Sequence, residues 1–182
     1  EENFNGYFGS TNSAWKATTN QTRCGITATG FGYEWHKWDP RFDVANPAYT
    51  NEANRYGWVV EIDPNKPKSP PVKRTALGRF KHEGACVVVG ENNRVVVYMG
   101  DDERFDYIYK FVSSRDWKKL IEDGKSPLDE GTLYAARFNE DGTGDWLELS
   151  PKNPALSTWT LENILVYTRL AADAAGATPM DR

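Results

Sequence analysis

Two short acidic groups stand where strand-like runs of the sequence begin and end. His82-Glu83-Gly84 lies between two such runs, and Gly100-Asp101-Asp102-Glu103 directly follows a third. Pairing of these strands can place both groups at neighbouring strand ends. Carboxylates gathered at one rim suit hard cations, since Ca²⁺ takes about six to eight oxygen ligands and ferric iron also accepts carboxylates. The pattern predicts a metal site; the alternative is a solvated turn and a glycine that permits a positive φ.

The two ends of the chain supply further polar groups. Glu1-Glu2-Asn3 is a third oxygen-rich group, and Arg182 closes the sequence in Met180-Asp181-Arg182. A guanidinium can hold a phosphate through two hydrogen bonds while metal ions hold the remaining oxygens. For both groups the alternative is an ordinary solvated terminus.

Other catalytic chemistries have little support. The sequence has two histidines and no GxSxG, HExxH or GxxxxGK[ST] pattern, which disfavours a serine hydrolase, a zinc protease and a P-loop enzyme. Cys24 and Cys86 stand 62 positions apart without a CxxC motif, so we expect buried or inert thiols and leave their pairing open. His36, flanked by Trp35 and Trp38, is expected to be a packing residue.

The elements that position these groups are mainly β. Period-2 and continuous β-rich runs predict strands at 57–63, 73–80, 85–89, 94–99, 105–112, 132–138 and 145–149. Helical spacing predicts helices at 114–123 and 159–175, and residues 25–56 are expected to form a long ordered loop with buried aromatics. A strand roughly every ten to twelve residues is typical of sheet-rich repeats such as propeller blades.

Length and composition limit the remaining possibilities. The 182 residues are 39% hydrophobic and 13% aromatic, and a chain of this length buries roughly 70% of its unfolded surface, so one ordered core is expected. The net charge of −4 gives no basic stripe along which a phosphate backbone could bind, so we predict no nucleic-acid-binding module. No apolar run approaches the roughly 18 to 20 residues of a membrane helix, so we predict no membrane span.

Several stretches resemble the PhoX-type alkaline phosphatase family, in the same order along the chain. They are 1–9, 56–64, 73–85, 98–105, 131–138 and 169–182, with the motifs Glu-Glu-Asn, His-Glu-Gly, Gly-Asp-Asp and Met-Asp-Arg. The resemblance implies a β-propeller whose central face holds an iron and calcium cluster, Fe³⁺ and Ca²⁺. It also implies hydrolysis of small-molecule phosphate monoesters in the periplasm or outside the cell.

Family residues transfer only where the motifs match. The resemblance implies that Glu83 and Asp102 are metal ligands, that Arg182 contacts the substrate phosphate, and that Glu1 lies beside the cluster as a further metal residue. The family's iron-binding Cys falls just before Glu1 and another acidic ligand falls two positions beyond Arg182, so both lie outside this sequence.

Residues 1–182 are therefore expected to be a single incomplete β-propeller domain, truncated at both ends. At about 40 to 45 residues per blade, the chain supplies fewer blades than a closed propeller needs. The fragment alone is expected to be inactive. Two alternatives stay open: a non-catalytic propeller that binds partners, and a calcium-dependent lactonase or phytase-like hydrolase on a similar propeller.

Overall fold

The computed structural model describes residues 1–181 and divides the chain into two compact units, Glu1–Gly57 and Trp58–Arg182. The first unit consists of short helical turns. They are η1 (Phe4–Tyr7), α1 (Thr19–Arg23), η2 (Trp35–Lys37), η3 (Pro40–Phe42), η4 (Pro47–Tyr49) and η5 (Glu52–Arg55). Helix α1 begins with a capping box, in which Thr18 and Gln21 satisfy each other's backbone N–H groups. The buried core of the first unit includes Phe4, Phe8, Ile26 and Phe42.

The segment 25–56 is ordered, but only some of its aromatic residues are buried as predicted. Phe42 and His36 are buried, whereas Trp38 is 86% exposed and Phe31 and Tyr33 are about half exposed. The expectation of buried aromatics is wrong for these three residues and for Trp35, which is 43% exposed. A unit of 57 residues has too little interior to cover all its large side chains.

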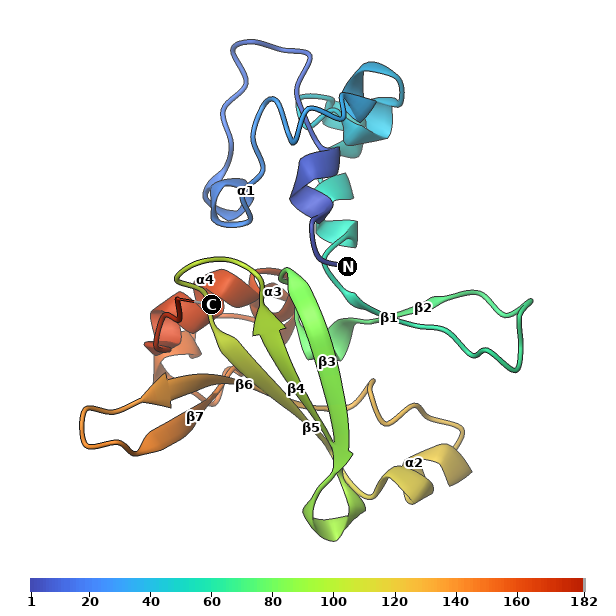
Figure 1. The fold of residues 1–182 in the computed structure, drawn as a ribbon, viewed down its shortest axis with the longest axis vertical. Coiled ribbons are helices and arrows are strands. Elements are labelled where there is room, and N and C mark those ends of the chain that lie inside the picture. Colours follow the sequence, from blue (N-terminus) through green and yellow to red (C-terminus); the bar gives the residue numbers. More distant parts are fainter. Residues whose placement is uncertain (182) are drawn as a thin grey trace. The chain divides into compact units, whose positions relative to one another are not determined.

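The second unit is built on antiparallel sheets, as the β-rich pattern predicts. Its strands are β1 (Val59–Glu61), β2 (Val72–Arg74), β3 (His82–Val89), β4 (Val95–Asp101), β5 (Ile108–Ser113), β6 (Gly131–Phe138) and β7 (Gly144–Glu148). Strands β1 and β2 pair as a separate hairpin, and β3 to β7 form a five-stranded sheet in chain order. Figure 1 shows this sheet and the projecting β1–β2 hairpin.

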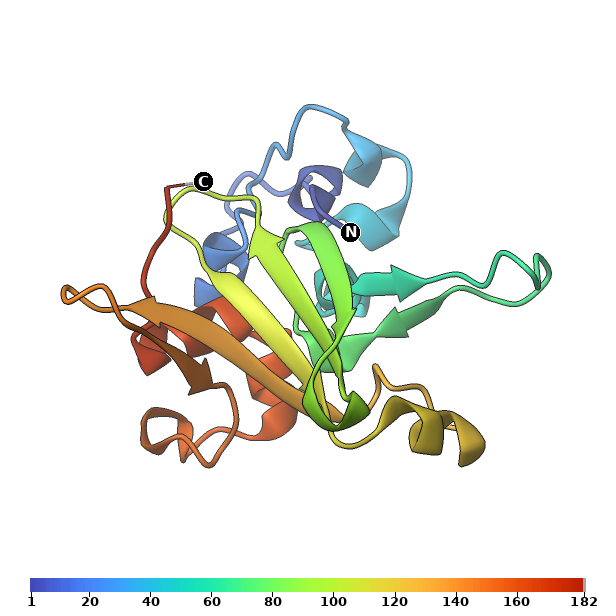
Figure 2. The same cartoon turned by 60° about the horizontal axis from the view of Figure 1, so that its bottom comes forward.

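One face of the five-stranded sheet forms the core. Along β4, Val95, Val97 and Met99 are buried. The register places Val97 opposite Phe111 and Phe111 opposite Leu133. The helices α3 (Leu161–Val166) and α4 (Thr168–Ala175) contribute Ile164 and Ala171 to the same cluster. Figure 2 shows these orange and red helices behind the sheet. The opposite sheet face remains partly open.

The predicted strand 73–80 is wrong in its second half. After β2 the chain makes the turn η6 (Thr75–Leu77) and then passes through Gly78 at φ +81°. Leu77 and Phe80 are fully buried. The chain therefore turns into the core here, and burial of these two side chains overrides the β-rich pattern.

The predicted helix 159–175 is helical over most of its length, but it is two helices separated at Tyr167 and not one. Thr160 caps the first helix, and Gly176 ends the second in a left-handed conformation. At the break the Arg79 N–H donates to the Leu165 carbonyl at 3.0 Å and to the Thr168 hydroxyl at 2.9 Å. The first of these tertiary hydrogen bonds occupies the Leu165 carbonyl, which a continuous helix would use for the N–H of Arg169. The shorter predicted helix is confirmed as α2 (Trp117–Glu122).

Neither cysteine forms a disulfide within the described residues 1–181. Of the expected buried or inert thiols, Cys24 is buried in the first unit, whereas Cys86 is exposed on β3, so only inertness stays a prediction for Cys86. Every residue of β3 after His82 is exposed, and its outer edge pairs with no strand among the described residues.

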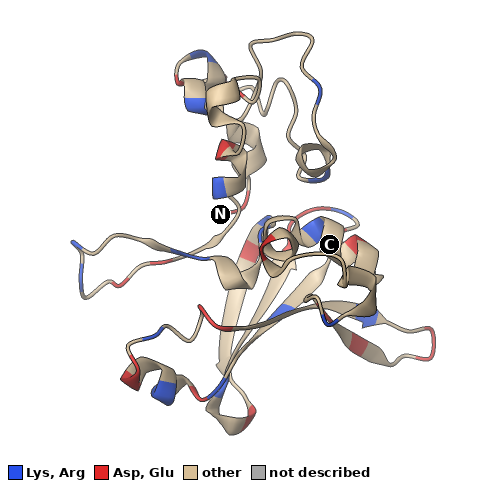
Figure 3. Ribbon diagram, turned by 180° about the vertical axis from the view of Figure 1, so that it is seen from behind, with Lys and Arg blue, Asp and Glu red and all other residues tan. Residues whose placement is uncertain are grey.

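Charged residues of both signs are interspersed over the described part of the second unit (Figure 3). Several form surface pairs, such as Arg137 with Asp145 at 2.7 Å and Arg115 with Asp123 at 2.5 Å. None of the helices within residues 1–181 has the length and apolar character required to cross a membrane.

We predict that Gly78→Ala destabilises the second unit more than Gly124→Ala. Both glycines have positive φ, but a Cβ at position 78 would come within 2.6 Å of Leu133 Cδ2 and 2.9 Å of Thr168 Oγ1, while one at position 124 meets nothing within 4 Å. The steric clash at position 78 should lower the free energy of unfolding by about 1–3 kcal/mol more than the change at position 124 does. Urea unfolding of both variants in the full-length protein measures the difference; equal losses would contradict the packing argument.

Candidate metal site at the start of strand β3

Glu83 occupies a β-bulge at the first residues of β3. His82 pairs with Asp101 and Gly84 pairs with Gly100, so Glu83 is the extra residue on its strand. A bulge bends the strand and redirects the side chain of the extra residue. The paired glycines leave space beside it, since a Cβ added to either would meet nothing within 4 Å. A shallow hollow of about 420 Å³ lies over Gly84 and Gly100 and includes Glu83 in its lining.

Asp102 begins the turn after β4, beside the bulge. Its N–H donates to the Lys81 carbonyl at 2.9 Å, which ties the turn to the residue before β3. One oxygen of Glu83 and one oxygen of Asp102 lie within 4.8 Å of each other. The structure therefore brings the two predicted ligands together, and paired strand ends are the reason, as the sequence indicates. An all-carboxylate donor set fits Ca²⁺ or ferric iron.

Neighbouring acids of this turn are paired with basic residues. Arg169 on α4 donates to both oxygens of Asp101, from Nε at 2.7 Å and from Nη2 at 2.5 Å. Nη2 also lies 3.5 Å from an oxygen of Asp106. The three side chains are at most 3% exposed, so this is a buried ion pair that fixes the turn.

Glu103 forms a second pair, with the buried ammonium group of Lys81. Burial raises the pKa of Glu103, but the hydrogen bond and charge of Lys81 outweigh it, so the pKa lies below its usual value. Sequence reasoning gave no role to Arg169 or Lys81. A signal for Arg169 existed: it lies four residues after Leu165 and three before Ala172, on the apolar side of the predicted helix, where a charge calls for a buried partner.

The segment before Arg182 runs alongside the same turn. Met180 and Asp106 form an antiparallel bridge. The Met180 N–H donates to the backbone carbonyl of Asp106 at 2.8 Å, and the Phe105 N–H donates to the backbone carbonyl of Met180 at 2.7 Å. Asp181 lies 3.8 Å from the Arg104 guanidinium. Arg182 itself lies outside the described residues.

Glu1 belongs to the first unit. One of its carboxylate oxygens accepts the N–H of Gly57 at 3.1 Å, which joins the first and last residues of that unit. Its predicted place beside a metal cluster stays a prediction.

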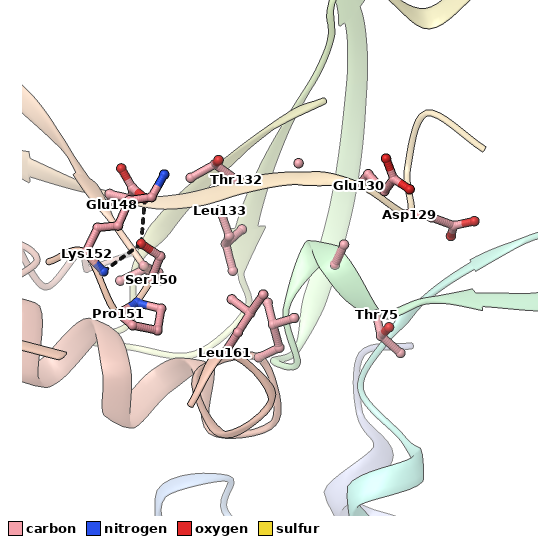
Figure 4. Close-up of a pocket in the computed structure, with 14 residues that line it drawn as sticks. Thr75, Asp129, Glu130, Thr132, Leu133, Glu148, Ser150, Pro151, Lys152 and Leu161 are labelled. Atoms are coloured by element: carbon pink, nitrogen blue, oxygen red, sulfur yellow. Dashed lines mark hydrogen bonds between the residues drawn. The ribbon is translucent and has the colours of Figure 1, made fainter. Parts of the chain in front are cut away.

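A separate pocket of about 630 Å³ lies at the opposite end of the sheet, near the start of β6 (Figure 4). Leu133, Leu161 and Leu165 contribute apolar side chains to its lining. Its acids already have partners: Asp129 pairs with Arg74 at 2.7 Å, Glu130 with Lys125 at 2.5 Å, and Glu148 accepts from Ser150 at 2.5 Å. The pocket is thus a poorer cation site than the bulge at Glu83.

His82 is a buried core residue, and its ring carries no charge at pH 7. Its ring stacks on Phe80 at 3.7 Å between centroids, and its Nε2 lies 3.0 Å from the Gly78 carbonyl. Because a carbonyl only accepts, Nε2 carries the proton, and the buried Nδ1 has no partner among the described residues. Burial lowers the pKa of His82 to about 3, so the ring is neutral at pH 7.

Taken together, fold and site describe an antiparallel β protein with a carboxylate-based candidate cation site at one end of its sheet. The family model "Alkaline phosphatase PhoX" matches residues 1–182. The chain belongs to the PhoX alkaline phosphatase family, as its motifs indicate.

A solved structure described as Pseudomonas fluorescens PhoX in complex with vanadate, a transition state analogue, is similar over the whole chain. It shows 47% sequence identity and a TM-score of 0.89 over 100% of this chain and 33% of that chain. The chain therefore spans about a third of the length of that relative. No curated protein matches it.

We predict that His82 makes the fold sensitive to mild acid. The unfolded ring takes up a proton near pH 6.5, whereas the folded ring does so only near pH 3, so stability present above pH 6.5 is lost progressively as the pH falls through this window. His82→Gln keeps a donor near the Nε2 position but does not titrate. Urea unfolding of the full-length protein between pH 7 and 5 should show a smaller loss of unfolding free energy for the variant than for wild type. An equal dependence on pH in both proteins would disprove the role of His82.

Proposed function

We propose that the full-length protein hydrolyses phosphate monoesters with the help of bound Ca²⁺ and Fe³⁺, held in part by Glu83 and Asp102. The observation that carries the proposal is the approach of these two carboxylates, within 4.8 Å, in a chain of the alkaline phosphatase family. The vanadate complex of the similar Pseudomonas fluorescens protein adds support, because vanadate resembles a phosphoryl group during transfer.

The two carboxylates have distinct local roles in this proposal. Glu83 extends from a bulge, which sets its direction independently of the strand pairing. Asp102 stands on a turn fixed by the Lys81 carbonyl and by the buried pair at Asp101. Bound cations would neutralise phosphate oxygens and help to form the attacking oxygen nucleophile. The chain's own contribution is to hold the two ligands in place.

Arg182 is proposed to contact the substrate phosphate. Its planar guanidinium can form two parallel hydrogen bonds to phosphate oxygens, which a lysine cannot reproduce. The bridge between Met180 and Asp106 supports this role, because it holds the preceding segment against the turn that carries Asp102. Glu1 is proposed as a further metal residue on family resemblance alone.

The larger architecture and location are also proposals. A propeller blade is an antiparallel meander, usually of four strands, and the meander of β3 to β7 has the same chain-ordered pairing with five strands. On this basis we propose that residues 1–182 form an incomplete part of a propeller domain. Family membership supports a protein exported to the periplasm or the cell exterior.

We expect Glu83→Gln and Asp102→Asn in the full-length protein to lower metal content and phosphatase kcat together. Loss of an outer partner of a metal ligand costs about 10–100-fold, so loss of a ligand should cost at least tenfold. Elemental analysis and p-nitrophenyl phosphate turnover measure both quantities.

Glu91→Gln is the matched control, because Glu91 is exposed in the turn at the other end of β3 and β4. It should leave both quantities unchanged. A Glu83 or Asp102 variant with full metal content and normal kcat would refute the ligand assignment. Turnover of a lactone or phytate in place of p-nitrophenyl phosphate would favour the related hydrolases, and a metal-free, inactive protein would favour a binding module.

A further inference from the structure

We infer that Arg169 is a positioning residue for Asp102: it fixes the turn after β4 and thereby sets the affinity of the site for cations. The inference rests on the proposed function, in which Asp102 is a ligand. Arg169 lies on α4, 67 positions along the chain from Asp102, and its guanidinium pairs with Asp101 and Asp106.

The geometry makes Asp101 the link between Arg169 and the site. Arg169 Nε and Nη2 hold the two Asp101 oxygens at 2.7 and 2.5 Å, so the carboxylate is fixed in position and in rotation. The Asp101 N–H donates to the backbone carbonyl of Tyr107 at 3.2 Å, and the Asp102 N–H donates to the backbone carbonyl of Lys81 at 2.9 Å. Side chain and backbone together leave the residue before Asp102 little freedom.

The same helix holds the far side of the turn. Arg169 Nη2 lies 3.5 Å from Asp106, and Asp173, one helical turn later, accepts from the Tyr107 hydroxyl at 2.6 Å. Helix α4 therefore contacts both ends of the turn, at Asp101 and at Asp106-Tyr107. Any shift of α4 would reach Asp102 through this connection.

Burial explains why an arginine is needed. Because the Arg169 side chain is 3% exposed and the Asp101 side chain is fully buried, water has little access to replace a missing hydrogen bond. A lysine at position 169 would keep the charge but could not offer the fork of donors that spans Asp101 and Asp106. The turn would then lose its fixed geometry while the net charge of the core stayed the same.

The test is calorimetric titration of the chelator-treated full-length protein with Ca²⁺, for wild type, Arg169→Lys and Asp102→Asn. Arg169→Lys should weaken Ca²⁺ affinity about 10–100-fold, the range for partners that orient metal ligands. Phosphatase activity of the variant should need more Ca²⁺ for half-activation but approach the wild-type kcat at saturating Ca²⁺, which a general loss of folding would not produce.

Arg74→Lys is the matched control. Arg74 also bridges two carboxylates, Glu61 at 2.5 Å and Asp129 at 2.7 Å, but it lies on the separate β1–β2 hairpin. It should leave Ca²⁺ affinity within twofold of wild type. Loss of affinity equal to that of Arg169→Lys would mean that any disrupted arginine pair has this effect, and would overturn the inference.

The remaining outcomes separate the two proposals. If wild type binds no Ca²⁺, or Asp102→Asn binds it normally, the proposed function fails. If Asp102→Asn loses affinity while folded Arg169→Lys keeps it, the positioning role alone fails. Should Arg169→Lys not fold, Asp101→Asn takes its place; wild-type affinity in that variant would overturn the positioning role.

Discussion

Arg169 places a guanidinium in the interior of the second unit, where a charge without partners would be strongly destabilising. Its pairing with Asp101 and Asp106 satisfies that charge and, in doing so, attaches α4 to the end of the sheet. A buried pair of this kind often adds little net stability, but breaking it is costly. Its effect is on geometry, since the turn between β4 and β5 has one well-defined position against the helix.

That turn lies where three distant parts of the chain meet. The bulge at Glu83 begins β3, Asp102 follows β4, and Met180 forms a bridge with Asp106 near the end of the described chain. Antiparallel pairing alone brings the first two together, while the third depends on α4 and the segment after it. This arrangement brings an oxygen of Glu83 and an oxygen of Asp102 within 4.8 Å, as the proposed cation site requires. The surrounding acids are paired with Arg169 and Lys81 and are less suited to bind a cation.

The predicted strands were largely confirmed where alternating burial and strand pairing agree. β4, β5 and β6 bury every second residue against one another, so a period of two was a reliable guide. Prediction failed where a tertiary contact competes with a local preference. The Arg79 N–H donates to the carbonyl of Leu165, where the predicted helix divides into two. Burial of Leu77 and Phe80 ends the predicted strand 73–80 early.

The sequence by itself determined the antiparallel β character, the acidic groups at paired strand ends and the family, because side-chain periodicity and contiguous motifs are local properties. Only the tertiary structure decided which acids are paired with basic residues, that Glu83 lies in a bulge, and that His82 is a neutral core residue. Each of these depends on burial and on partners supplied from distant positions. Asp101 and Asp102 are adjacent in sequence, yet the Asp101 side chain is fully buried in its pair with Arg169 while an oxygen of Asp102 approaches Glu83. The difference depends on Arg169, which lies 68 positions along the chain from Asp101.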